Sequence, residues 1–169
     1  MNTAATKPKT ARSAGVRAGA AKVMVSFGGV VLAQIHGLEA KTPSAGIAPC
    51  QLIDVIRQGL PVQELAALLA SLDVPMEKLA PLLGISKATL HRRKAQGRLS
   101  PGESDRVIRY ARLMGKAVET LEGDHAARLW LSSAQVGLGG AVPLDYAGTE
   151  VGAREVEDLL GRIEYGVYS

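Results

Sequence analysis

Residues 76–97 read MEKLAPLLGISKATLHRRKAQG and constrain the fold more than any other part of the chain. Their small, turn-forming and apolar positions have the spacing of a helix-turn-helix, in which helices pack across one short turn. Ala80 is small where the second helix crosses closely, and Gly84 can adopt the left-handed backbone of the turn. Ile85 and Leu90 are apolar where the turn and the second helix meet a core. The stretch therefore predicts a helical domain.

Two residues depart from this pattern. Pro81 lies inside the first helix of the pair, where proline removes a backbone hydrogen bond or bends the helix. Arg93 stands where many such helices repeat an apolar residue. Because of these two departures, an alternative interpretation remains open. In that alternative the segment is a charged helix hairpin that does not bind DNA.

The outer face of the second helix is the predicted DNA-binding surface. A helix N-terminus beside Ser86 suits a phosphate, and arginines suit phosphates or guanine edges. An ordinary surface histidine is an equal interpretation of His91. The predicted DNA-binding residues are Ser86, Lys87, Thr89, His91, Arg92 and Lys94.

Charge is distributed unevenly along the chain, although the formal net charge is only +4. Residues 1–22 carry five basic residues and no acid, and residues 87–116 carry nine basic residues against two acids. Residues 117–169 reverse the balance, with nine acids against three arginines. A basic block beside an acidic block predicts two surfaces with different partners, the basic one fitting nucleic acid.

Helix start and stop signals follow one another from residue 52 onward. Ser100, Pro101 and Glu103 form a capping box with proline at the first helical position. Thr149 can cap a final helix that runs to about residue 165. Aromatic residues make up only 4% of the chain, which favours small helices over a sheet sandwich. We therefore predict an all-α fold.

Three segments are predicted. Residues 1–50 form an irregular basic N-terminal extension and linker, within which residues 23–37 fit either a strand or a short helix. Residues 51–115 form a helix-turn-helix domain, and residues 116–169 form a small helical C-terminal domain.

Catalytic, metal and membrane functions have little support. The single cysteine, Cys50, allows no internal disulfide and has no identifiable His–acid partner. His36, His91 and His125 lack metal-ligand spacing. The apolar stretch 23–38 is interrupted and shorter than the roughly 20 residues of a membrane helix. We expect a cytoplasmic protein that is not an enzyme, has no cofactor and no metal, and does not associate with a membrane.

The final helix is predicted to be amphipathic. Val156, Leu159, Leu160 and Ile163 form an apolar stripe at helical spacing, while Arg154–Asp158 and Asp158–Arg162 are candidate i, i+4 ion pairs. The chain then ends in GRIEYGVYS, with two tyrosines in its last five residues. These tyrosines either fold back onto their own domain or reach a partner, since aromatic side chains are typical interface anchors.

Two stretches together resemble a known family. They are LLGISKATLHRRKAQGRLSPGESDRVIRYARL and GLGGAVPLDYAGTEVGAREVEDLLGRIEYGVYS. Over roughly residues 52–169 the chain resembles the Xre/MbcA/ParS-type antitoxins, the partners of RES-domain toxins. The resemblance implies a helix-turn-helix part that represses the operon encoding antitoxin and toxin. It also implies a C-terminal domain that blocks the active site of the toxin.

Toxins of this family consume NAD or use it for ADP-ribosyl transfer, so the resemblance implies an antitoxin without a cofactor. The implied partners are a RES-domain toxin, operator DNA and a second copy of the chain within a larger complex. A stand-alone regulator whose C-terminal module only dimerises is the alternative. The implied toxin-binding residues are Pro143, Leu144, Asp145, Arg154, Glu157, Asp158, Arg162, Tyr165, Val167, Tyr168 and Ser169.

Overall fold

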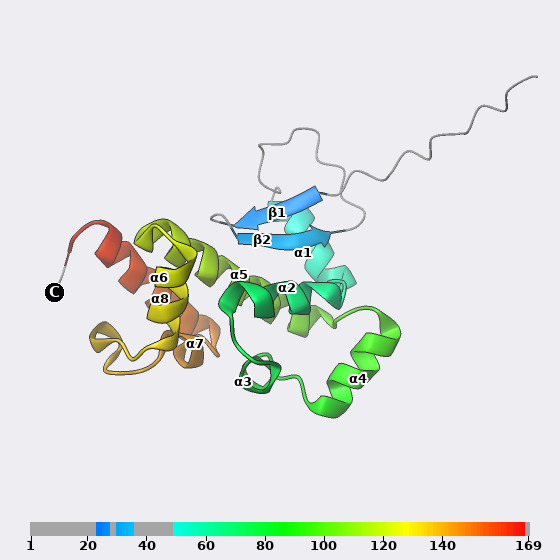
Figure 1. The fold of residues 1–169 in the computed structure, drawn as a ribbon. Coiled ribbons are helices and arrows are strands. Elements are labelled where there is room, and N and C mark those ends of the chain that lie inside the picture. Colours follow the sequence, from blue (N-terminus) through cyan, green and yellow to red (C-terminus); the bar gives the residue numbers. More distant parts are fainter. Residues whose placement is uncertain (1–22, 28–29, 36–48, 168–169) are drawn as a thin grey trace, which may run out of the picture.

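The computed structural model describes residues 23–27, 30–35 and 49–167, and side chains from residue 52 to 167 (Figure 1). From residue 49 onward the described chain is helical, so the predicted all-α fold is confirmed. Its first half contains α1 (Pro49–Gln58), α2 (Gln63–Leu72), α3 (Met76–Leu82) and α4 (Lys87–Gln96). Its second half contains α5 (Pro101–Leu121), α6 (Asp124–Ser132), the 3-10 turn η1 (Val136–Leu138), α7 (Pro143–Tyr146) and α8 (Glu150–Glu164).

The N-terminal extension contains the regular element that the sequence left undecided between strand and helix. Strands β1 (Val23–Phe27) and β2 (Val30–Ile35) pair antiparallel, with Phe27 opposite Val30 and an irregularity between Val23 and Val25. Both strands lie against α5, and β2 also lies against α2 (Figure 1). Residues 1–22, whose basic charge suggested a DNA contact, lie outside the described residues.

Helix α5 is the central element of the fold. It packs against α1 and α2 on one part of its length and against α6 and α8 on another. The buried side chains form one continuous cluster, which runs from Val55 in α1 to Leu160 in α8 and includes the fully buried Tyr110 of α5. One long helix therefore carries both the helix-turn-helix and the C-terminal helices.

Backbone hydrogen bonds join the loop after α1 to the loop after α4, beside the N-terminus of α5. The Leu99 amide donates to the Leu60 carbonyl at 2.8 Å, and the Val62 amide donates to the Gly97 carbonyl at 3.0 Å. Gly59 has a φ of +84°, and a Cβ there would collide with the Leu99 carbonyl. Only glycine fits this position, because it tolerates both the left-handed backbone and the close approach. These hydrogen bonds hold the C-terminal end of α4 in place against the core.

Candidate functional site

Helix α4 projects from the domain as a charged, solvent-facing element. The Ser86 hydroxyl caps it by accepting from the Thr89 amide at 3.1 Å, and Gly97 ends it at a φ of +74°. None of its residues is buried. Ser86 is thus the N-cap of α4, and Gly97 is its glycine stop.

Most of the predicted DNA-binding side chains lie together on this helix. Lys87, His91, Arg92 and Lys94 are exposed, whereas Thr89 is half-buried. The hydroxyls of Ser86 and Thr89 lie 2.9 Å apart, so both take part in the cap. Two lysines, one arginine and one histidine are therefore exposed together on α4.

Arg93 points in the opposite direction, toward α5. Its Nε donates to Oε2 of Glu103 at 2.7 Å, and its Nη2 donates to Oε1 of the same carboxylate at 3.1 Å. Oε2 also accepts from the Ser100 amide at 2.7 Å, which completes the predicted capping box. The residue that departs from the apolar pattern thus forms a bidentate ion pair, the geometry for which a guanidinium is suited.

Glu103 is ionised in this arrangement. Burial on its own would raise the pKa of this carboxyl, but hydrogen bonds from Arg93 and Ser100 outweigh burial and hold the pKa below its ordinary value. The Glu103 side chain is 8% exposed and that of Arg93 is 18% exposed. The pair therefore lies at the edge of the core, where it connects α4 to the first turn of α5.

The turn between α3 and α4 follows the prediction. Gly84 has a φ of +66°, Ile85 is buried, and the Ile85 amide donates to the Ala80 carbonyl at 2.8 Å. Pro81 lies inside α3 near its end, on the exposed side of the helix. Arg106 of α5 donates to the Leu83 carbonyl at 3.1 Å, so α5 supports this turn directly.

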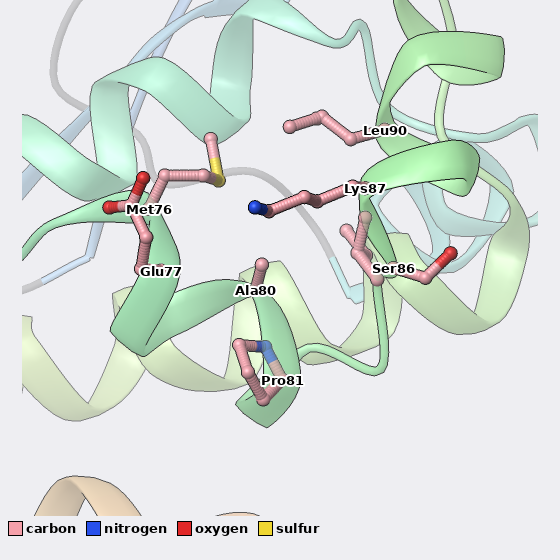
Figure 2. Close-up of a pocket in the computed structure, with 8 residues that line it drawn as sticks. Met76, Glu77, Ala80, Pro81, Ser86, Lys87 and Leu90 are labelled. Atoms are coloured by element: carbon pink, nitrogen blue, oxygen red, sulfur yellow. The ribbon is translucent and has the colours of Figure 1, made fainter.

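A groove separates α3 from α4 (Figure 2). It has a volume of about 480 Å³, and apolar side chains from Met76, Ala80 and Leu90 line it. In Figure 2 Lys87 extends across the groove toward Met76. The groove lies beside the N-terminal end of α4.

The C-terminal helix α8 is bound to α5 by ion pairs. Arg109 Nε donates to Glu150 at 3.0 Å, and Arg112 Nε donates to Glu157 at 2.7 Å. Arg109 also donates to Asp105 of its own helix at 3.1 Å. Glu157, a predicted toxin-binding residue, is therefore engaged within the chain.

The ion pairs expected along α8 are wrong. Arg154 pairs backward with Glu150, with an Nε–Oε1 distance of 3.3 Å, and it forms no pair with Asp158. Asp158 and Arg162 are both exposed and form no ion pair with one another. Glu150 lies between Arg109 and Arg154 and pairs with both guanidinium groups, which accounts for the position of Arg154.

Pro143 and Leu144 lie in the core of the chain rather than on its surface. The buried Tyr110 hydroxyl donates to the Leu144 carbonyl at 3.0 Å, and burial raises the pKa of Tyr110 to about 12. Asp145, in contrast, is exposed. Of these three predicted toxin-binding residues only Asp145 presents its side chain to solvent.

The end of α8 leaves its last aromatic residue exposed. Tyr165 is 79% exposed and Val167 is 53% exposed. The chain turns at Gly166, which has a φ of +67°, and the Val167 amide donates to the Arg162 carbonyl at 2.9 Å. Tyr165 therefore does not fold back onto the domain. Tyr168 and Ser169 lie outside the described residues.

The most exposed large hydrophobic residue of the described chain was not predicted from the sequence. Val136 in η1 is 94% exposed and lies beside Gly137. A single valine in a glycine-rich turn gives no periodicity signal, so nothing in the sequence alone indicated its exposure.

Over residues 52–167, no three His, Cys, Asp or Glu side chains gather as metal ligands would. None of the helices that the structure describes is long and apolar enough to cross a membrane.

Two known domain families match the chain. Residues 51–112 match the antitoxin Xre-like helix-turn-helix domain, and residues 116–166 match the antitoxin Xre/MbcA/ParS C-terminal toxin-binding domain. The two matches meet inside α5, near the predicted boundary between residues 115 and 116.

Individual proteins are similar over most of the chain. A Yersinia enterocolitica protein named antitoxin Xre is 37% identical over 120 residues, which cover 70% of this chain and 81% of the relative. A Photorhabdus laumondii protein of the same name is 32% identical, with 68% and 79% covered. A Sphingobium protein named Prs ADP-ribosylating antitoxin is 29% identical, with 72% and 83% covered.

Proposed function

The chain belongs to the Xre/MbcA/ParS family of antitoxins, and we propose that it neutralises a RES-domain toxin and represses its own operon. The C-terminal helices bind the toxin and block its active site. Helix α4 binds operator DNA. The chain itself catalyses no reaction.

The observation that carries the toxin-binding half is the contrast along α8. Val156 and Leu160 are fully buried and anchor the helix, whereas Tyr165 and Val167 beyond its end are exposed. A rigid helix that presents exposed aromatic and aliphatic side chains is suited to deliver them to a pocket, because little conformational entropy is lost on binding. The tail, residues 165–169, is therefore the proposed blocking segment.

The toxin is proposed to act on NAD. The name of the Sphingobium relative supports a partner that transfers ADP-ribose. A pocket for an anionic dinucleotide is expected to be positively charged, and α8 with its tail carries five carboxylates against two arginines over residues 150–167. Such opposite charges accelerate association and favour the correct partner.

The DNA-binding half rests on α4. Its exposed Lys87, Arg92 and Lys94 offer positive charge on the second helix of a helix-turn-helix, which is the helix that enters the major groove in this class of domain. Replacing Arg92 by alanine is expected to lower the slope of log K against log salt concentration by about one, if Arg92 contacts a phosphate.

Co-purification tests the toxin-binding half. The full chain should form a stable complex with the toxin of its own operon and inhibit it, and the chain truncated after residue 164 should not inhibit it. If the full chain binds no such toxin but forms a dimer through residues 116–167, the protein is a stand-alone regulator instead.

A further inference from the structure

Residues 134–137 and the end of α8 enclose an apolar groove on the C-terminal domain. The groove has a volume of about 410 Å³. That volume lies within the range of about 300–1,000 Å³ that is usual for ligand pockets. The lining side chains and backbone include Ala134, Val136, Gly137, Leu159, Ile163 and Val167.

The wall opposite α8 is held in place by hydrogen bonds. The Gln135 amide donates to the Ala141 carbonyl at 3.0 Å, and the Gly140 amide donates to the Gln135 carbonyl at 2.9 Å. The Gln135 side chain donates from Nε2 to the Trp130 carbonyl at 2.9 Å. The groove is thus formed before any partner arrives, which reduces the entropic cost of binding.

The floor of the groove depends on a glycine. A Cβ on Gly137 would stand only 2.6 Å from Cδ1 of Leu159, so the Leu159 side chain packs directly on the backbone of η1. Val136 and Val167 also line the groove and are 94% and 53% exposed. Large apolar side chains gathered around a groove mark an interaction site.

The charges on α8 indicate the chemistry of the occupant. Glu155 lies one helical turn before Leu159, and Asp158 lies one turn before Arg162 of the groove. Neither carboxylate has an ion-pair partner among the residues that the structure describes. A partner with an apolar side chain flanked by basic residues would satisfy both features.

We propose that this groove is a second docking site for the toxin and receives an apolar side chain of the toxin beside a basic patch. The inference rests on the proposed toxin-neutralising function. The groove is continuous with the tail, because Val167 lines it two residues after Tyr165.

The test uses the full chain and the toxin of its operon. Val136→Asp places a charge at the mouth of the groove and leaves the fold intact, because the residue is almost fully exposed. It should weaken toxin binding by about tenfold or more, as a truncated hot spot does. The matched control is Ile53→Asp on α1, which is 49% exposed and lies outside residues 116–166. The control should change the affinity by less than about twofold.

A second variant tests the groove itself. Ala134→Trp at the exposed rim should fill the groove and weaken toxin binding as Val136→Asp does. Toxin affinity that is unchanged in both variants would overturn the inference, while the proposed function stands if the unaltered chain still inhibits the toxin. If Val136→Asp leaves the toxin affinity unchanged but lowers the molecular mass of the free protein in solution, the groove binds a second copy of the chain. That result would also overturn the inference. Failure of the unaltered chain to bind toxin refutes the proposed function instead.

Discussion

Arg93 of α4 and Glu103 of α5 form a bidentate ion pair across the point where the projecting basic helix meets the core. The carboxylate simultaneously accepts the Ser100 amide at the start of α5. One side chain thus caps a helix and orients its neighbour. The direction of α4, and with it the position of Arg92 and Lys94, depends on this contact.

Arg93→Ala is therefore expected to weaken operator binding without removing a DNA contact. The Glu103 carboxylate would lose two charged hydrogen bonds, and we expect the free energy of unfolding to fall by about 2–3 kcal/mol. The salt slope of DNA binding should stay unchanged, because Arg93 neutralises no phosphate. Thermal unfolding and binding at several salt concentrations measure both quantities.

Arg92→Ala is the matched control for Arg93→Ala, because its side chain is exposed on the same helix. It should change the salt slope and leave the unfolding free energy almost unaltered. A salt slope that falls for Arg93→Ala, at unchanged stability, would show that Arg93 reaches the DNA and that its ion pair does not orient α4.

Glu64 makes stability dependent on pH. Burial raises the pKa of this carboxyl in α2 to about 7, and its Oε2 atom has no hydrogen-bond partner in the described part of the chain. The folded state holds the proton more tightly than the unfolded state, so this carboxyl destabilises the fold progressively as pH rises from about 4.5 to 7.

Glu64→Gln is accordingly expected to be more stable than the unaltered chain at pH 8, by on the order of 2 kcal/mol, and to have nearly equal stability at pH 4.5. Denaturant unfolding at the two pH values measures the difference. Glu77→Gln in α3, an exposed carboxyl, serves as the control. The same difference at both pH values would contradict an ionisation effect.

Gly152 of α8 lies directly against the backbone of α7. A Cβ at this position would collide with the backbone carbonyl of Tyr146, which cannot rotate away. Gly152→Ala is expected to destabilise the chain by about 1–3 kcal/mol, the usual cost of overpacking. Gly161→Ala in the same helix has open space around it and should be neutral or stabilising. Similar melting temperatures for the two variants would contradict the collision.

The sequence predicted local features better than contacts between distant residues. The Ser100–Glu103 capping box, the helix N-terminus beside Ser86 and the Gly84 turn each depend on residues a few positions apart, and all three are present. The second role of Glu103, as the partner of Arg93, depends on the angle between two helices. The spacing of residues in the sequence does not determine the angle between α4 and α5.

The candidate toxin-binding surface could be predicted only in part. The apolar stripe predicted that α8 is amphipathic, but it left open whether Tyr165 folds back or is exposed. The burial of Leu144 and the pairing of Glu157 with Arg112 arise from packing against α5. Arg112 and Glu157 are 45 residues apart in the sequence. The exposure of Val136 was not predicted, because the burial of a residue in a short turn depends on which other segments pack against it. The local sequence pattern does not contain that information.

The inhibition of the purified toxin by two forms of the chain tests the toxin-neutralising function most directly. Titration of the operon's toxin with the full chain should abolish its NAD-dependent activity at a stoichiometric ratio. The chain truncated after residue 164 keeps the buried anchors Val156 and Leu160, so it should stay folded yet leave the toxin active. Full inhibition by the truncated chain, or no inhibition by the full chain, would contradict the proposal.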